Sequence, residues 1–126
     1  MTSPRYVLAV VPDLFFAGKI SAVANATGVE VAFAPAAEVP ARCAAREPAL
    51  VVLDLHAGPE VNALIRTLKA AEETRGVPLL GFFAHIDLEI RNAAVAAGID
   101  RTIPRSAFVT RLPELLSGQA SPAGGA

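Results

Sequence analysis

The sequence has one cysteine, only two histidines and no tryptophan. A single cysteine, Cys43, excludes an intrachain disulfide, and with His56 and His85 as the remaining soft ligands a structural zinc site is a poor fit. The formal net charge is -1 and the basic residues form no dense run. Nothing in the composition therefore favours binding to nucleic acid or to an anionic membrane.

Long apolar runs and an N-terminal targeting pattern are also missing. No run approaches the length of a membrane span, and the start MTSPRYVLAVV lacks the charged, apolar and small-residue order of a secretory signal. We therefore expect a soluble, cytoplasmic protein without a membrane partner. The 126 residues fit one domain over 1–117, and the small, polar residues at 118–126 predict a disordered tail.

Enzyme signatures are equally scarce. Ser21, Ser106 and Ser117 lie outside any nucleophile-elbow motif, and no acid and base pair stands out along the chain. No glycine-rich phosphate loop follows the first apolar segment. We expect neither an enzyme nor a cofactor.

What the sequence has in abundance is an alternation of short valine-rich segments with stretches of helical period. Segments 6–11, 29–34, 49–55, 77–84 and 99–103 predict strands that are mostly apolar on both faces. Segments 14–27, 36–46, 59–74, 87–98 and 108–116 predict helices. Strict alternation of this kind predicts a three-layer, doubly wound α/β fold with a parallel sheet.

Glycine and proline mark the predicted helix boundaries. Gly28, Gly76 and Gly98 each follow a helical segment, as expected of a residue that ends a helix. Pro40 shortens or delays the second helix. Asp87 predicts an N-cap for the fourth helix, and Thr110 predicts one for the last, which places Pro113 in its first turn.

An aspartate, Asp54, ends the buried segment ALVVLDL. A buried charge costs several kcal/mol unless it is paired, hydrogen-bonded or bound to a metal. The carboxyl ends of parallel strands form the usual binding edge of such sheets. The residues that share this edge with Asp54 are Pro12, Asp13, Phe83, Ala84, Pro104 and Arg105.

Three segments, ALVVLDL, RGVPLLGFFAHID and DLEIRNAAVAAGIDRTIPRSAF, together resemble the receiver domain of two-component response regulators. The resemblance extends over nearly all of 6–116. It implies a flavodoxin-like (βα)5 fold with strand order 2-1-3-4-5, and it places Asp54 at the position of the phosphoacceptor. It also implies a role in phosphorelay signalling through protein partners.

The metal-binding part of the family pattern is altered. Receivers carry acidic residues after the first strand, which hold magnesium together with the acceptor. Here those positions are Val11 and Pro12, and Asp13 follows one residue late. We interpret Asp13 as a solvated carboxylate at a helix start, stabilised by the helix dipole.

The remaining family positions are altered as well. A small hydroxyl residue is replaced by Phe83, whose bulk we expect to fill the space of a phosphoryl group. The conserved lysine is replaced by Arg105, a broader and bidentate cation, with Ser106 in place of proline. The aromatic switch position falls on Thr102.

These changes favour a degenerate receiver, or pseudo-receiver, that binds a protein without magnesium-dependent phosphorylation. In this interpretation Asp54 pairs with Arg105 in place of the metal cluster. The expected docking surface is the fourth helix, fifth strand and fifth helix, which could also form a homodimer. Its candidate residues are Ile90, Arg91, Arg101, Arg111 and Leu112.

Two alternatives remain open. A working receiver would phosphorylate Asp54, with Asp13 and Asp54 as the magnesium ligands. A small-molecule module would use the same edge of the sheet, as other flavodoxin-like folds do. His56 and His85 could line that edge, although we expect both at the surface.

Overall fold

Five apolar segments form β-strands in the computed structural model, which describes residues 4–118. All pairings are parallel and the strand order is β2-β1-β3-β4-β5, as predicted. Strands β1, β3 and β4 are buried on both faces, which explains their unbroken apolar sequences. The strands are β1 (Tyr6–Val10), β2 (Glu30–Phe33), β3 (Leu50–Asp54), β4 (Leu79–Phe83) and β5 (Arg101–Pro104).

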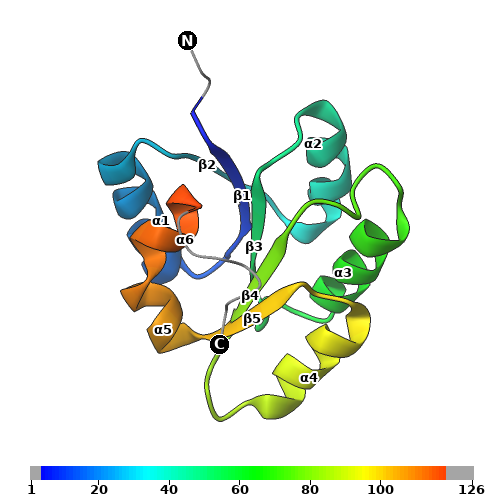
Figure 1. Cartoon of the computed structure of the whole chain (residues 1–126). Helices are drawn as coiled ribbons and strands as arrows, with labels where there is room; N and C mark the ends of the chain where they lie inside the picture. The colour runs from blue at the N-terminus through cyan, green and yellow to red at the C-terminus, as the bar shows by residue number, and fades with distance from the viewer. Residues whose placement is uncertain (1–3, 119–126) are drawn as a thin grey trace.

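Helices cover both faces of the sheet (Figure 1). One face carries α1 (Leu14–Thr27), α5 (Arg105–Thr110) and α6 (Leu112–Ser117). The other carries α3 (Glu60–Ala70), α4 (Leu88–Ala97) and a 3-10 turn, η1 (Ala36–Glu38), that leads into α2 (Val39–Ala45). The predicted three-layer architecture is confirmed.

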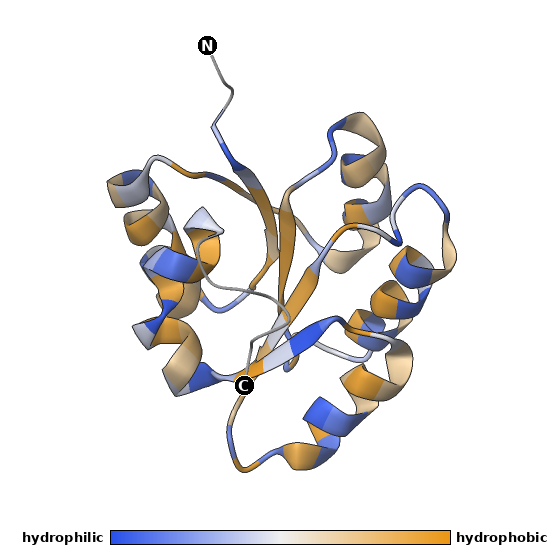
Figure 2. Ribbon diagram, viewed as in Figure 1, coloured by the Kyte–Doolittle hydropathy of each residue, from blue (hydrophilic) through white to orange (hydrophobic). Residues whose placement is uncertain are grey.

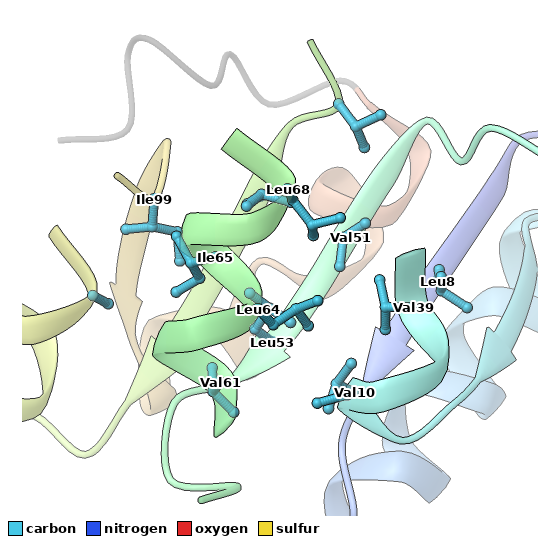
Figure 3. Close-up of a cluster of buried hydrophobic side chains, with 14 of the residues drawn as sticks. Leu8, Val10, Val39, Val51, Leu53, Val61, Leu64, Ile65, Leu68 and Ile99 are labelled. Carbon is cyan, nitrogen blue, oxygen red and sulfur yellow. The ribbon is translucent and has the colours of Figure 1, made fainter. Parts of the chain in front are cut away.

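The sheet separates two hydrophobic cores, because successive side chains of a strand point to opposite faces. Figure 3 shows the core under α2, α3 and α4, where Leu53 of β3 packs with Val61 and Ile65 of α3. On the other face, Val52 and Phe82 pack with Phe108 of α5. Figure 2 shows the same division, with apolar strands in the middle and polar residues on the outer helix surfaces.

Glycine ends two of the three helices for which it was predicted. Gly28 and Gly98 adopt positive φ angles of 75° and 106° after α1 and α4, where a side chain would be strained. The prediction for Gly76 is wrong. Helix α3 already ends at Ala70, because the following turns are held by hydrogen bonds such as Thr74 Oγ1 to the carbonyl of Leu68 (2.7 Å).

The C-terminal helix differs from its prediction. It begins at Arg105 and is divided at Arg111 into α5 and α6, so Thr110 is not its cap. The Thr110 hydroxyl instead donates to the carbonyl of Ser106 (3.0 Å). Pro113 does lie in the first turn of α6, where its missing N–H is harmless. Asp87 precedes α4 as expected, but its side chain makes no capping hydrogen bond.

Of the predicted tail, 118–126, one residue belongs to the part of the chain that the structure describes. Gly118 closes α6, and 119–126 lie outside the described residues. Within 4–118, no helix combines the length and the apolar character needed to cross a bilayer.

Candidate functional site

The candidate site is the carboxyl edge of the sheet, toward the bottom of Figure 1, where β1, β3 and β4 end. Asp54 is the last residue of β3 and is only 5% exposed. Its Oδ1 accepts a hydrogen bond from the backbone N–H of His56 at 2.9 Å. This two-residue spacing is an Asx turn, in which the carboxylate satisfies the backbone that leaves the strand.

Arg105 does not pair with Asp54, and the predicted contact is therefore wrong. Within residues 4–118, no ion pair or hydrogen bond joins the two side chains. The Arg105 guanidinium lies over the Phe16 ring of α1, 5.0 Å from its centroid, and its buried Nε has no hydrogen-bond partner. A ring face attracts a cation, and this contact holds the guanidinium against α1.

The residues after β1 do not supply the acidic pair. Val11 is buried in the core under α1, and Pro12 has no side-chain oxygen to offer. The Asp13 carboxylate accepts hydrogen bonds from the N–H groups of Phe15 (2.8 Å) and Phe16 (3.2 Å), so it caps α1. The prediction that Asp13 is a helix-start carboxylate is confirmed.

The aromatic residues at the end of β4 are placed differently from the prediction. Phe83 packs in the core under α3, on the face opposite to Val52 and hence opposite to Asp54. The Phe83 ring is buried in that core and does not lie beside Asp54. The expectation that Phe83 fills the space of a phosphoryl group is therefore wrong. Phe82 is the residue that shares both register and face with Asp54.

Phe82 belongs to an aromatic cluster that the sequence analysis missed. Its ring lies 4.5 Å from that of Phe108, in a stacked arrangement, and 5.6 Å from that of Phe16. Strand alternation puts Phe82 and Phe83 on opposite faces of the sheet, and the register of β3 with β4 is needed to tell which of them lies beside Asp54. Thr102, at the aromatic switch position, is half-buried and lies opposite Gly81 in the sheet.

His56 has a role that the sequence did not reveal. Its Nε2 accepts a hydrogen bond from the backbone N–H of Ala84 at 3.0 Å, and it lies 3.9 Å from a carboxylate oxygen of Asp87. An amide N–H can only donate, so Nε2 is the unprotonated nitrogen of this ring. His56 therefore links the loop after β3 to the loop after β4, whereas His85 is exposed as expected.

The site fits a magnesium ion poorly. Magnesium prefers several oxygen ligands in octahedral geometry. Asp54 offers one carboxylate, and that of Asp13 is turned to the N-terminus of α1. Across the described part of the chain, His, Cys, Asp and Glu side chains form no group of three that could hold a metal.

The residues proposed for the docking surface are less available than predicted. Leu112 is 1% exposed in the core and is therefore not free for a partner, whereas Ile90 is half-buried and packs against the other core. Leu112 is the first residue of α6, and its side chain is buried between this helix and the sheet. Arg91, Arg101 and Arg111 are half-buried.

No protein-family model matches the sequence, and no curated protein matches it either. Solved structures do resemble it. The chemotaxis response regulator CheY4 of Vibrio cholerae has a TM-score of 0.76 at 16% sequence identity, over 94% of this chain and 100% of that chain. The phosphorylated cyanobacterial phytochrome response regulator RcpA has a TM-score of 0.74 at 19% identity, over 93% and 91%.

A third structure is similar to the same extent. The receiver domain of the sensor histidine kinase PA1611 from Pseudomonas aeruginosa, with magnesium coordinated in its active-site cleft, has a TM-score of 0.75 at 17% identity. The alignment covers 92% of this chain and 99% of that domain. The chain therefore has the CheY-like receiver fold, which confirms the predicted fold class.

Proposed function

We propose that this chain is a receiver-like signalling module that acts through protein contacts, without magnesium-dependent phosphorylation of Asp54. The observation that carries the proposal is the isolation of the Asp54 carboxylate. Val11 and Pro12 stand where the acidic pair would be, and Asp13 is engaged as a helix cap. Phosphoryl transfer depends on a metal and cations that neutralise the developing charge.

The test is incubation with acetyl phosphate and magnesium, followed by intact mass spectrometry. Because the chain has no tryptophan, mass is a more direct measurement than fluorescence. We expect no gain of a phosphoryl group, and the same mass for Asp54→Asn. A gain in the wild type that Asp54→Asn abolishes would reject the proposal.

A restoring variant makes a negative result informative. Val11→Asp with Pro12→Asp returns two carboxylates to the end of β1. We expect this variant to gain magnesium-dependent NMR shifts at Asp54 and His56 that the wild type lacks. Equal shifts in both proteins would mean that the wild-type edge already binds the metal.

A working receiver remains the second candidate. It is favoured by the retention of Asp54 at the end of β3, and by the similarity in fold to a response regulator solved in its phosphorylated form. In that case Asp13 and Asp54 would hold magnesium, which requires Asp13 to leave the N-terminus of α1. The mass experiment decides between the two candidates.

The protein partner is proposed to dock at the carboxyl edge of the sheet. Large apolar side chains are exposed after β1, where Leu14 is 87% and Phe15 64% exposed, and after β4, where Ile86 is 77% exposed. Figure 2 shows the apolar positions in the loop between β4 and α4. We expect the partner to be in the cytoplasm.

A further inference from the structure

A hollow of about 360 Å³ opens at the carboxyl ends of β1 and β2, beside the loop after β3. Its volume lies within the range of small-molecule sites. Most of its walls are apolar, and the residues that line it include Val11, Pro12, Phe33, Pro35, Ala57 and Glu60. The hollow lies at the edge where doubly wound sheets bind ligands.

The altered residues after β1 form part of this hollow. Val11 and Pro12, which stand where receivers carry their acidic pair, contribute apolar surface to it. Phe33 adds a partly exposed aromatic ring from the end of β2. The same two substitutions that remove metal ligands thus make this side of the edge suited to an apolar ligand.

Glu60 is the one charged side chain among the described residues that line the hollow. Its carboxylate lies against the Cα of Gly58, where an added Cβ would come within 2.5 Å of Oε2. Gly58 has a φ of 128°, a backbone conformation that favours glycine at this position of the loop.

The Glu60 carboxylate is available to a ligand. Within residues 4–118 it forms no hydrogen bond or ion pair. It lies in the first turn of α3, beside the positive end of the helix dipole. The nearby Arg42 donates to the carbonyl of Phe33 (3.3 Å) and does not line the hollow.

We propose that this hollow binds a small organic cation, with an aromatic or aliphatic body against Phe33 and Pro35 and an ammonium group at Glu60. An anionic ligand of the same shape would face the Glu60 carboxylate, and a bare metal ion would find a single ligand. The proposal goes beyond the proposed function, because it does not depend on whether Asp54 is phosphorylated.

The test is an NMR titration of the full chain with 2-phenylethylamine, compared with 2-phenylethanol and 3-phenylpropanoate. We expect saturable shifts at Ala36 and Ala57 with the amine, weaker binding of the alcohol and the weakest binding of the carboxylate. Since an exposed ion pair contributes little, Glu60→Gln should weaken amine binding about threefold. The alcohol should bind the wild type and Glu60→Gln equally.

The matched control is Glu89→Gln. Glu89 also lies in the first turn of a helix, α4, but lines a separate hollow of about 370 Å³ between α3 and α4. This variant should bind the amine as the wild type does. Ala57→Leu should fill the proposed site and remove the saturable shifts, while its amide spectrum shows that it remains folded.

Three results would overturn the proposal. The first is equal binding of the amine by the wild type and Glu60→Gln. The second is binding of the carboxylate as tightly as the amine, and the third is unchanged binding by Ala57→Leu. None of these results depends on the mass experiment, so the two proposals fail separately.

Discussion

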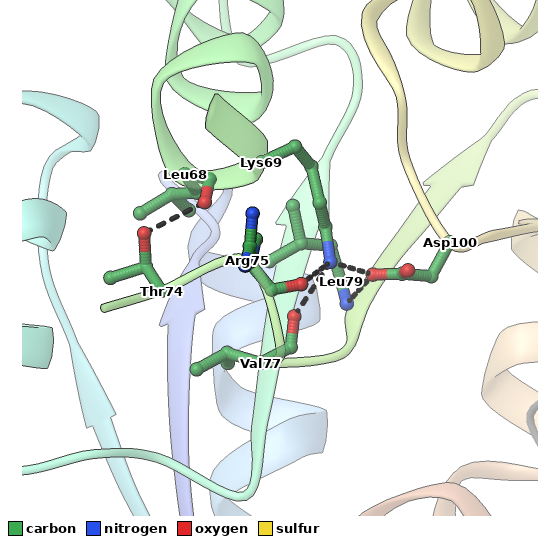
Figure 4. Close-up of polar contacts among 7 residues, drawn as sticks. All are labelled: Leu68, Lys69, Thr74, Arg75, Val77, Leu79 and Asp100. Atoms are coloured by element: carbon green, nitrogen blue, oxygen red, sulfur yellow. Dashed lines mark hydrogen bonds and ion pairs between the residues drawn. The ribbon is translucent and has the colours of Figure 1, made fainter. Parts of the chain in front are cut away.

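The two edges of the sheet are built in different ways. At the amino edge, Lys69 Nζ donates to the carbonyls of Arg75 (2.9 Å) and Val77 (3.0 Å) and pairs with Asp100 (2.6 Å). Asp100 also accepts from the backbone N–H of Leu79 at 2.7 Å (Figure 4). One lysine and one aspartate thus join α3, the loop that follows it, the start of β4 and the loop before β5.

The carboxyl edge has no comparable network in the described residues. Asp54 accepts a backbone hydrogen bond from within its own loop, Arg105 Nε has no hydrogen-bond partner, and Leu14 and Ile86 are largely exposed. A polar network joins chain segments at one edge, and large apolar side chains are left in water at the other. The amino edge therefore serves stability, and the carboxyl edge is the region that a partner or ligand would cover.

The largest effect on stability is expected from removing the Lys69 ammonium group from the polar network at the amino edge. Lys69→Met keeps the apolar stem but leaves the carbonyls of Arg75 and Val77 and the Asp100 carboxylate without their donor. We expect a loss of about 2 to 3 kcal/mol in the free energy of unfolding. Urea denaturation followed by circular dichroism measures it.

The control for this variant is on the same helix. Arg66 is exposed on α3, and Arg66→Met should change the free energy of unfolding by less than about 0.5 kcal/mol. Similar losses in both variants would show that the Lys69 network has no special importance for stability.

A smaller effect is expected from His56, which joins two loops of the carboxyl edge. His56→Ala removes the acceptor for the N–H of Ala84, and we expect a loss of about 1 kcal/mol. Hydrogen exchange of the Ala84 amide should accelerate as well. His85→Ala, on the exposed part of the same loop, should leave both quantities unchanged, and an equal effect would contradict the role assigned to His56.

The fold could be predicted from the sequence because its signals are local. Valine-rich runs, helical period and glycine at helix ends depend on a few neighbouring residues, and they gave the strands and α1 within one or two residues. The prediction that Gly76 ends α3 was wrong because the turns after α3 are held by side-chain hydrogen bonds of Thr74 and Lys69. Those bonds are not visible in local composition.

The site could be predicted only in part. Asp54 at the end of a strand and Asp13 at the start of a helix follow from position alone. The partner of Arg105 does not, because Phe16 lies 89 positions earlier and meets it only when α1 and α5 share a face. Phe82 and Phe83 differ by one residue, and only the register of β3 with β4 shows which one lies on the side of Asp54.

The smallest effects on stability are expected from variants that distinguish two partners of the Arg105 guanidinium, the Phe16 ring and the Asp54 carboxylate. If the Phe16 ring holds its guanidinium, a double-mutant cycle of Phe16→Leu and Arg105→Ala should give a coupling energy of about 0.5 to 1 kcal/mol. The cycle of Asp54→Ala and Arg105→Ala should give a coupling within about 0.3 to 0.5 kcal/mol of zero, because no ion pair joins those side chains. Urea denaturation of the single and double variants measures both couplings. The reverse pattern would restore the ion pair that the sequence predicted, and the carboxyl edge would then have a polar contact of the kind that Lys69 and Asp100 form at the amino edge.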